Sequence, residues 1–298
     1  SWENGLEFLG LVAIFDPPRQ EVKTALEQCR KAGIDVLMLT GDSAATAKAV
    51  GEQIGLLKEG DEIITGDQLG SFSAEILIEN ISKVRIFARV SPNDKLMIVE
   101  ALQNQGKVVS VTGDGVNDAA ALKKAQVGVA MGLTGTDVAK EASDLIITDD
   151  NFATIVGAIE QGRIIYLNLA RAIKYLLACN LGEILTVLGC LILGFPLPLS
   201  PLAILWMNLV TDGFPALALA VDSKHEGILS RNKLSLGISG NLLDSKNTKS
   251  IAFWSVILAI GAIISFIYSQ PLGLNQSRMY VFTFLELGEQ ILAYIVRG

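Results

Sequence analysis

The tripeptide Thr-Gly-Asp twice follows a short apolar run, and both copies could bind an anion. The first copy consists of Thr40, Gly41 and Asp42, and the second opens the segment TGDGVND at residues 112–118. A hydroxyl group and unshielded glycine amides between the end of a strand and the start of a helix form a pocket for phosphate oxygens. Both segments are therefore predicted to line a phosphate-binding crevice.

Two carboxylates of the second segment suit a divalent metal ion. Asp114 lies in the predicted loop and Asp118 in the first helical turn, so both can point into the crevice. Mg²⁺ binds through one or two carboxylates together with phosphate oxygens and water. A third Thr-Gly-Asp copy, at residues 65–67, stands alone, and we interpret it as a common turn with a helix cap.

A lysine follows another predicted strand. Residues 88–95 read ARVSPNDK, so that Lys95 lies in the first turn of a helix that Ser91 or Asn93 could cap. A lysine in this place could neutralise a phosphate as a point charge. Considered without its neighbours, such a lysine is more often a solvated surface residue.

Short apolar runs alternate with amphipathic stretches up to about residue 160. The predicted strands are residues 9–15, 34–39, 84–88, 107–111, 127–131 and 145–147, and the predicted helices are residues 21–31, 44–54, 92–103 and 117–125. This alternation is typical of an α/β domain with a parallel, doubly wound sheet, whose ligands bind beyond the carboxyl ends of the strands.

Composition separates the chain into two unlike halves. The 298 residues include 50% hydrophobic and 18% charged residues, and the mean hydropathy of +0.44 is too high for an ordinary soluble protein. Residues 1–162 carry a net charge of −10 and residues 163–298 one of +3. The apolar content excludes a disordered chain, and the overall charge of −7 argues against a nucleic-acid partner.

Cysteine and histidine give little sign of metal binding. Cys29, Cys179 and Cys190 share no CxxC spacing, so we expect small buried apolar residues rather than disulfides or a thiolate metal site. The single histidine, His225, cannot form a histidine-based site alone.

Four stretches of the second half are long enough to cross a bilayer. They lie at residues 175–195, 200–221, 250–269 and 279–296, each near the ~20 residues that a spanning helix needs. We therefore expect a soluble α/β domain at residues 1–160 and an all-α transmembrane bundle at residues 161–298. Lysine and arginine concentrate before the first span and in the loop at residues 222–249, which predicts a cytoplasmic location for that loop and for the soluble domain.

The spans carry polar side chains at helical spacing. Asn180 and Glu183 share one face of the first span, and Asn208, Thr211 and Asp212 share one face of the second. Ionisable residues inside a bilayer mark function more often than structural pairing. Facing oxygens of this kind suit Ca²⁺, although sodium ions or protons would also accept them. Gly213 and Pro215 are predicted to loosen the second span and to free backbone carbonyls. In the fourth span, Glu286 is a weaker candidate for a cation ligand because Glu289 follows on the same face.

These motifs together resemble the P-type ATPases, most closely the sarco/endoplasmic-reticulum type of calcium pump and its bacterial relatives. The resemblance rests on DPPR at residues 16–19, ARVSPNDK at 88–95, TGDGVNDAAALKKAQVGVAM at 112–131, GTDVAKEASDLIITDDNF at 135–152 and NLVTDG at 208–213. It implies a haloacid-dehalogenase-like phosphorylation domain of the Rossmann type, followed by the fifth to eighth transmembrane helices.

The resemblance also implies roles for individual residues. Thr40 and Gly41 would hold the transferred phosphoryl group, Lys95 would offset its charge, Asp114 would hold Mg²⁺, and Asn117 and Asp118 would complete the site, with ATP as phosphoryl donor. The transported cation, Ca²⁺ or another small cation, would bind Asn180, Glu183, Asn208, Thr211 and Asp212, with Glu286 matching less closely.

The family's phosphorylated aspartate lies in the motif Asp-Lys-Thr-Gly-Thr, which does not occur in this sequence. Without that nucleophile the covalent step cannot occur. We therefore expect the carboxyl-side portion of a pump, which partners a lipid bilayer and the remainder of the pump and is not catalytically competent alone. Two alternatives stay open: a membrane-tethered phosphatase of the dehalogenase class, and a non-catalytic ion-binding or regulatory membrane protein.

Overall fold

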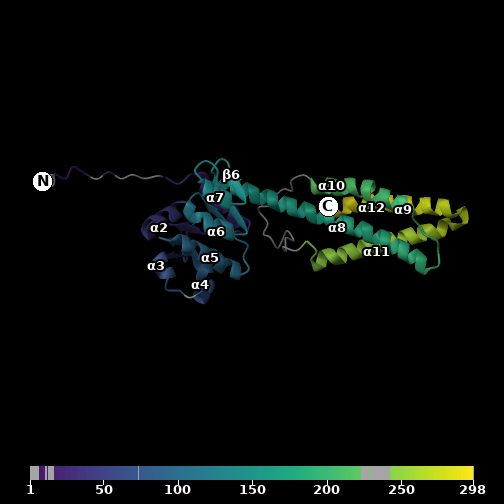
Figure 1. Cartoon of the computed structure of the whole chain (residues 1–298), viewed down its shortest axis with the longest axis horizontal. Coiled ribbons are helices and arrows are strands. Elements are labelled where there is room, and N and C mark those ends of the chain that lie inside the picture. The colour runs from purple at the N-terminus through teal and green to yellow at the C-terminus, as the bar shows by residue number, and fades with distance from the viewer. Residues whose placement is uncertain are drawn as a thin grey trace. The chain divides into compact units, whose positions relative to one another are not determined.

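The computed structural model describes residues 7–10, 12, 17–72, 74–222, 228 and 242–297. The chain divides into two units, Ser1–Gly157 and Ala158–Gly298 (Figure 1). The predicted strand at residues 9–15 and the predicted loop at 222–249 lie largely outside the described residues. Residues 7–10 and 12, which are described, are irregular.

The first unit contains two parallel sheets of three strands. The first sheet has the order β1-β3-β2, from Met38–Thr40, Val84–Ala88 and Glu62–Thr65, and the second has the order β4-β5-β6, from Ser110–Gly113, Val127–Met131 and Leu145–Ile147. The parallel α/β architecture is therefore confirmed. Two predicted strands start later than expected: the one predicted at residues 34–39 is Met38–Thr40, and the one predicted at 107–111 is Ser110–Gly113.

Helices connect these strands. They are α1 (Glu21–Lys31), α2 (Ala44–Gln53), α3 (Gly66–Leu69), α4 (Ala74–Asn80), α5 (Pro92–Asn104), α6 (Ala119–Lys124) and α7 (Asp137–Ala142), with 3₁₀ turns η1 (Ile81–Lys83) and η2 (Val116–Asp118). The helix predicted at residues 117–125 is thus a 3₁₀ turn followed by α6. The third Thr-Gly-Asp copy is a helix start as predicted, since Thr65 caps α3 in a reciprocal capping box.

The central strand β3 shows how both faces of the first sheet are covered. Successive side chains of a strand point to opposite faces. Ile86 packs with Leu26 of α1 and Ala47 of α2, whereas Phe87 packs with residues of α4 and α5, including Leu77 and Ile98. Both β3 residues are fully buried. This sheet therefore has helices on both faces, as expected of a doubly wound fold.

The second unit consists of long apolar helices. They are α8 (Phe152–Ile192), α9 (Pro201–Trp206), a π-helical turn η3 (Met207–Thr211), α10 (Gly213–Ala220), α11 (Ser245–Ser269), the 3₁₀ turn η4 (Gln270–Leu272) and α12 (Leu274–Arg297). Four stretches of the described chain are long and apolar enough to cross a membrane: Phe152–Ile192, Pro201–Ala220, Ser245–Leu272 and Leu274–Arg297. The predicted spans fall within or close to them, but α8 begins well before residue 175.

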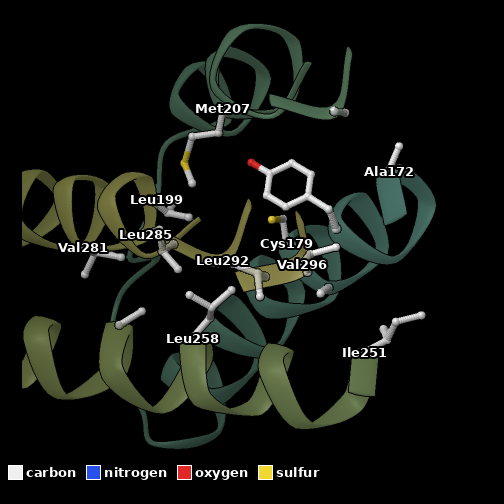
Figure 2. Close-up of a cluster of buried hydrophobic side chains, with 14 of the residues drawn as sticks. Ala172, Cys179, Leu199, Met207, Ile251, Leu258, Val281, Leu285, Leu292 and Val296 are labelled. Atoms are coloured by element: carbon white, nitrogen blue, oxygen red, sulfur yellow. The ribbon is translucent and has the colours of Figure 1, made fainter. Parts of the chain in front are cut away.

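Close helix packing builds the core of the second unit. Helices α11 and α12 run against each other (Figure 1). A Cβ added at Gly261 of α11 would lie 2.2 Å from Cζ of Phe284, so a larger residue there would force the Phe284 ring of α12 to shift. Figure 2 shows Cys179 of α8 and Leu292 of α12 in the same cluster of buried side chains, together with Leu258 of α11.

Candidate functional site

In the first unit, an ion pair joins two of the predicted site residues. Lys95 Nζ lies 2.6 Å from Asp118 Oδ1, and both side chains are largely buried. The other carboxylate oxygen, Oδ2, accepts the backbone N–H groups of Asp114 (3.3 Å) and Gly115 (3.2 Å). Asp118 therefore anchors the lysine and also shapes the loop that carries Asp114.

The local sequence explains the position of Lys95. Ser91 caps α5, its hydroxyl accepting the N–H of Asp94, whose carboxylate accepts the N–H of Ser91 in return. Pro92 occupies the first turn, where its missing N–H costs nothing. Of the two predicted caps, Ser91 is thus confirmed, and it lies four residues before Lys95.

The first Thr-Gly-Asp segment connects to the same region through the backbone. Arg89 donates its N–H to the carbonyl of Asp42 (3.0 Å), and Val90 donates to the carbonyl of Thr40 (3.1 Å). The Thr40 hydroxyl in turn accepts the N–H of Asp42. These bonds tie the loop after β1 to the segment that leads into α5 and Lys95. Gly41 is exposed, as a loop that receives an anion requires.

The loop after β4 is tightly built. A Cβ at Gly113 would lie 2.5 Å from Cβ of Asp118, so a larger residue would displace that carboxylate. The carbonyl of Asp114 accepts the N–H of Thr136 (2.8 Å). The Asp114 side chain is exposed and has no hydrogen-bond or ion-pair partner among the described residues, and Asn117 is also exposed.

The donor set in this loop fits Mg²⁺ through one carboxylate. Both oxygens of Asp118 already accept bonds from Lys95 and from backbone amides. Asp114 offers a carboxylate at a strand end, and Mg²⁺ characteristically adds water and phosphate oxygens to one or two such ligands. The arrangement therefore favours Asp114 as the metal ligand, with Asp118 holding Lys95.

Asp150 stabilises a neighbouring loop and was not singled out from the sequence. Its carboxylate accepts the N–H groups of Gly132 (2.6 Å), Leu133 (3.0 Å) and Thr134 (2.7 Å) and the Thr134 hydroxyl (2.8 Å). Burial alone would raise the pKa of Asp150, but these four hydrogen bonds outweigh it and lower the pKa to about 2. The loop fixed in this way leads directly to Thr136, which bonds the backbone of Asp114.

The second unit contains a separate polar cluster inside the candidate spans. Glu183 of α8 is 4% exposed, and its Oε2 accepts Nδ2 of Asn208 at 3.2 Å, from η3. Its Oε1 is buried with no donor within reach among the described residues. The two predicted oxygen-bearing faces therefore meet at Glu183 and Asn208.

A second group of carboxylates lies in the same bundle. Asp212 is fully buried, and its Oδ1 accepts the hydroxyl of Tyr175 at 3.1 Å. Ligand atoms of Cys179, Asp212 and Glu289 all lie within 4.8 Å of one another. Asp212 Oδ2 and both oxygens of Glu289 have no hydrogen-bond donor in the described part of the chain. Unpaired carboxylate oxygens in a dry environment are costly, which makes this cluster a candidate cation site.

The second span is loosened at this cluster, as predicted. The N–H of Asp212 bonds the carbonyl of Met207, five residues back, instead of the usual four. Pro215 has no N–H to give to the carbonyl of Thr211, the residue four positions earlier. That carbonyl accepts Nε2 of Gln290 from α12 instead, at 3.2 Å. The π-helical turn thus redirects a backbone oxygen away from the helix ladder.

Of the remaining predicted ligands, two hydrogen-bond within their own helix and one is half-buried. Asn180 is half-buried and turns its Nδ2 back to the carbonyl of Leu176, and the Thr211 hydroxyl bonds the carbonyl of Met207. Glu286 is half-buried, whereas Glu289 is 0% exposed and lies beside Asp212. Sequence reasoning placed Glu286 ahead of Glu289 and did not select Tyr175 or Cys179. The only available signal was the i, i+4 spacing of Tyr175, Cys179 and Glu183.

Two families match separate parts of the chain. Residues 2–126 match the haloacid dehalogenase-like hydrolases, and residues 196–298 match the family described as cation transporting ATPase, C-terminus.

Calcium ATPases from several organisms are similar to most of the chain. A calcium-transporting ATPase of Bacillus subtilis is 53% identical over 229 residues, which cover 77% of this chain and 26% of the relative. Calcium-transporting ATPase 1 of Lactococcus lactis is 41% identical over 298 residues, covering 99% of this chain and 33% of the relative. An endoplasmic reticulum calcium ATPase of Aspergillus fumigatus is 46% identical over 233 residues, covering 77% and 24%. The chain thus spans about a quarter to a third of the length of these relatives.

Proposed function

The chain belongs to the cation-transporting P-type ATPases, and from this premise we propose that it provides phosphoryl-binding and ion-binding parts of an ATP-driven Ca²⁺ pump. It is an integral membrane protein: four helices of its described part are long and apolar enough to cross a membrane, and its relatives are calcium-transporting ATPases. The chain covers only part of the length of those relatives. Ca²⁺ transport by a whole pump is therefore part of what we propose.

In the first unit, we assign the crevice to the transferred phosphoryl group. Thr40 and Gly41 would bind its oxygens, and Lys95, fixed by Asp118, would stabilise the negative charge of the transition state. Asp114 would hold Mg²⁺, which when bound neutralises phosphate charge. The family's acceptor aspartate lies in a motif that these 298 residues do not contain. The residues named here therefore bind and stabilise the phosphoryl group of ATP but do not accept it.

In the second unit, the carboxylates of Glu183, Asp212 and Glu289 would bind the transported cation. Ca²⁺ takes 6–8 oxygen ligands and tolerates irregular geometry. The observation that supports this assignment is that four buried carboxylate oxygens of these residues lack a hydrogen-bond donor among the described residues. A divalent cation would neutralise their combined charge.

Orientation and coupling form part of the same proposal. The concentration of lysine and arginine favours a cytoplasmic first unit. Helix α8 begins in the first unit and ends in the second, and its 41 residues correspond to roughly 61 Å of helix, about twice the hydrocarbon thickness. We propose that this continuous helix transmits movement between the phosphoryl site and the ion site.

Calcium binding by the chain in lipid nanodiscs tests the ion site. Radiolabelled Ca²⁺ should bind the unaltered chain, and Glu183→Gln and Asp212→Asn should each weaken binding by at least about tenfold, because each removes a charged ligand. Asp244→Asn is the matched control. Asp244 caps α11 outside the apolar part of that helix, and asparagine also caps. Equal Ca²⁺ affinity in all four proteins would refute the proposed ion site.

A further inference from the structure

Cys179 adds a sulfur atom to an otherwise oxygen-based cluster. Its Sγ and one carboxylate oxygen each of Asp212 and Glu289 lie within 4.8 Å of one another, and all three residues are buried. They come from different segments: α8, the junction between η3 and α10, and α12. Figure 2 shows the Cys179 side chain directed into the interior of the bundle, near Leu292 and Val296 of α12.

The Cys179 sulfur lies beside two buried carboxylates, and three of their four oxygens lack a hydrogen-bond donor among the described residues. Glu289 is 0% exposed, and neither of its oxygens has a donor within the described chain. Asp212 is also 0% exposed, and only its Oδ1 is satisfied, by the hydroxyl of Tyr175. Two carboxylates and a thiol thus converge without a lysine or arginine among the residues that form the cluster.

The spacing is close to that of a mixed sulfur and oxygen metal site. Zinc binds thiolate sulfur at about 2.3 Å and carboxylate oxygen at about 2.0–2.2 Å, so a sulfur and an oxygen ligand of one zinc ion lie at most about 4.5 Å apart. Small rotations of the three side chains would bring them from within 4.8 Å to bonding distance. A larger thiophilic cation such as Cd²⁺ needs less movement.

We propose that this cluster is a binding site for thiophilic divalent cations, of the Cd²⁺ and Zn²⁺ class, through Cys179, Asp212 and Glu289. On binding, the Cys179 thiol loses its proton to water and the sulfur bonds to the metal, with no change of oxidation state. Soft thiolate ligands select such metals, whereas Ca²⁺ prefers oxygen alone. The inference rests on the proposed ion site, since both classes of cation would share Asp212 and Glu289 and would therefore compete.

Cadmium is the probe that separates this site from a site made of oxygen alone. The full chain in lipid nanodiscs is titrated with Cd²⁺ while the ultraviolet thiolate-to-cadmium charge-transfer band is recorded. Cys179→Ser is compared with Cys190→Ser, a change of a second buried cysteine on the same helix that lies outside the cluster. Ca²⁺ binding is measured on the same samples.

We expect one Cd²⁺ per chain to produce the band in the unaltered protein and in Cys190→Ser, and added Ca²⁺ to suppress it. Cys179→Ser should lose the band, and its ratio of Cd²⁺ to Ca²⁺ affinity should fall by at least about tenfold. A band that persists in Cys179→Ser would overturn the proposal. If Ca²⁺ binds but no Cys179-dependent band forms, the thiophilic site fails and the proposed function survives. If the Cys179-dependent band forms but Ca²⁺ does not bind, the proposed function fails and the thiophilic site survives.

Discussion

Lys95 Nζ lies 2.6 Å from Asp118 Oδ1, and this pair joins the loops that follow strands of two different sheets. Lys95 belongs to the helix after β3, and Asp118 follows β4. Because the other oxygen of Asp118 accepts the amides of Asp114 and Gly115, the pair also fixes the loop that offers a carboxylate to a metal ion. One contact therefore organises most of the predicted phosphate crevice.

Removing the charge of Lys95 should loosen this loop. We expect Lys95→Met to lower the local opening free energy of residues 110–119 by about 1–3 kcal/mol, since it leaves a largely buried carboxylate without its cation. Hydrogen-exchange mass spectrometry of peptides from that segment measures the change. The control is Lys124→Met, because Lys124 pairs with Glu100 at 2.8 Å but on the surface. It should change the value by less than about 0.5 kcal/mol. Equal exchange in both variants would contradict the anchoring role.

Asp150 should make the first unit sensitive to acid. The pKa of Asp150 is lowered from 3.8 to about 2 in the folded state, so its contribution to stability is complete above about pH 4 and is lost as the pH falls through about 2. Asp150→Asn should therefore lower the thermal midpoint at neutral pH, and its difference from the unaltered chain should shrink between pH 4 and pH 2. Scanning calorimetry over this range measures the effect.

Asp149→Asn is the matched control for that prediction. Asp149 is exposed and accepts the hydroxyl of Thr154 and the N–H of Asn151, which lower its pKa. Its replacement removes the same charge one residue away but leaves the loop at residues 132–134 intact. A midpoint shift as large as that of Asp150→Asn would show that the acid sensitivity does not come from that loop.

Gln290 should stabilise the π-helical turn of the second span. Gln290→Ala leaves the carbonyl of Thr211 without a side-chain donor, and the expected loss is about 1 kcal/mol of unfolding free energy, as found for hydrogen bonds inside membranes. Thermal unfolding in nanodiscs gives the value. Gln276→Ala, an exposed change on the same helix, should have no measurable effect. A neutral Gln290→Ala would mean that this carbonyl finds another partner.

An unbroken α8 should be required for coupling. In a chimera of the Bacillus subtilis relative that carries this chain, two glycines inserted after Tyr166 should abolish ATP-driven Ca²⁺ uptake but leave Ca²⁺ binding in place, because the helix could no longer transmit force. The same insertion after Gly60, in a surface turn of the first unit, should leave uptake unchanged. Normal uptake with the Tyr166 insertion would refute the rigid-helix hypothesis.

Segments with an uninterrupted pattern and a clear boundary signal were predictable from the sequence. Strands β3, β5 and β6 and helix α1 lie at their predicted bounds, because each is an uninterrupted pattern with a clear boundary signal. The elements that were missed are β2, α4 and α7. In these elements, packing against neighbours outweighs local propensity.

The buried cluster of Cys179, Asp212 and Glu289 shows more clearly what could not be predicted from the sequence. Glu286 and Glu289 are three residues apart on one helix face, so periodicity cannot distinguish them, whereas the packed bundle buries Glu289 against Asp212. Cys179 shares no CxxC spacing with another cysteine. Its place beside two carboxylates arises only from the meeting of three helical segments. The crevice residues, by contrast, follow strand ends, where the fold class itself fixes their location.

The proposed ion site depends most directly on Glu289 as a cation ligand. The measurement is a Ca²⁺ binding isotherm of the chain in nanodiscs, compared between Glu289→Gln and Glu286→Gln, which make the same chemical change one helical turn apart. We predict that Glu289→Gln raises the dissociation constant by at least about tenfold and that Glu286→Gln raises it much less. An unchanged dissociation constant in Glu289→Gln would contradict a cation site built on the buried carboxylates of this bundle.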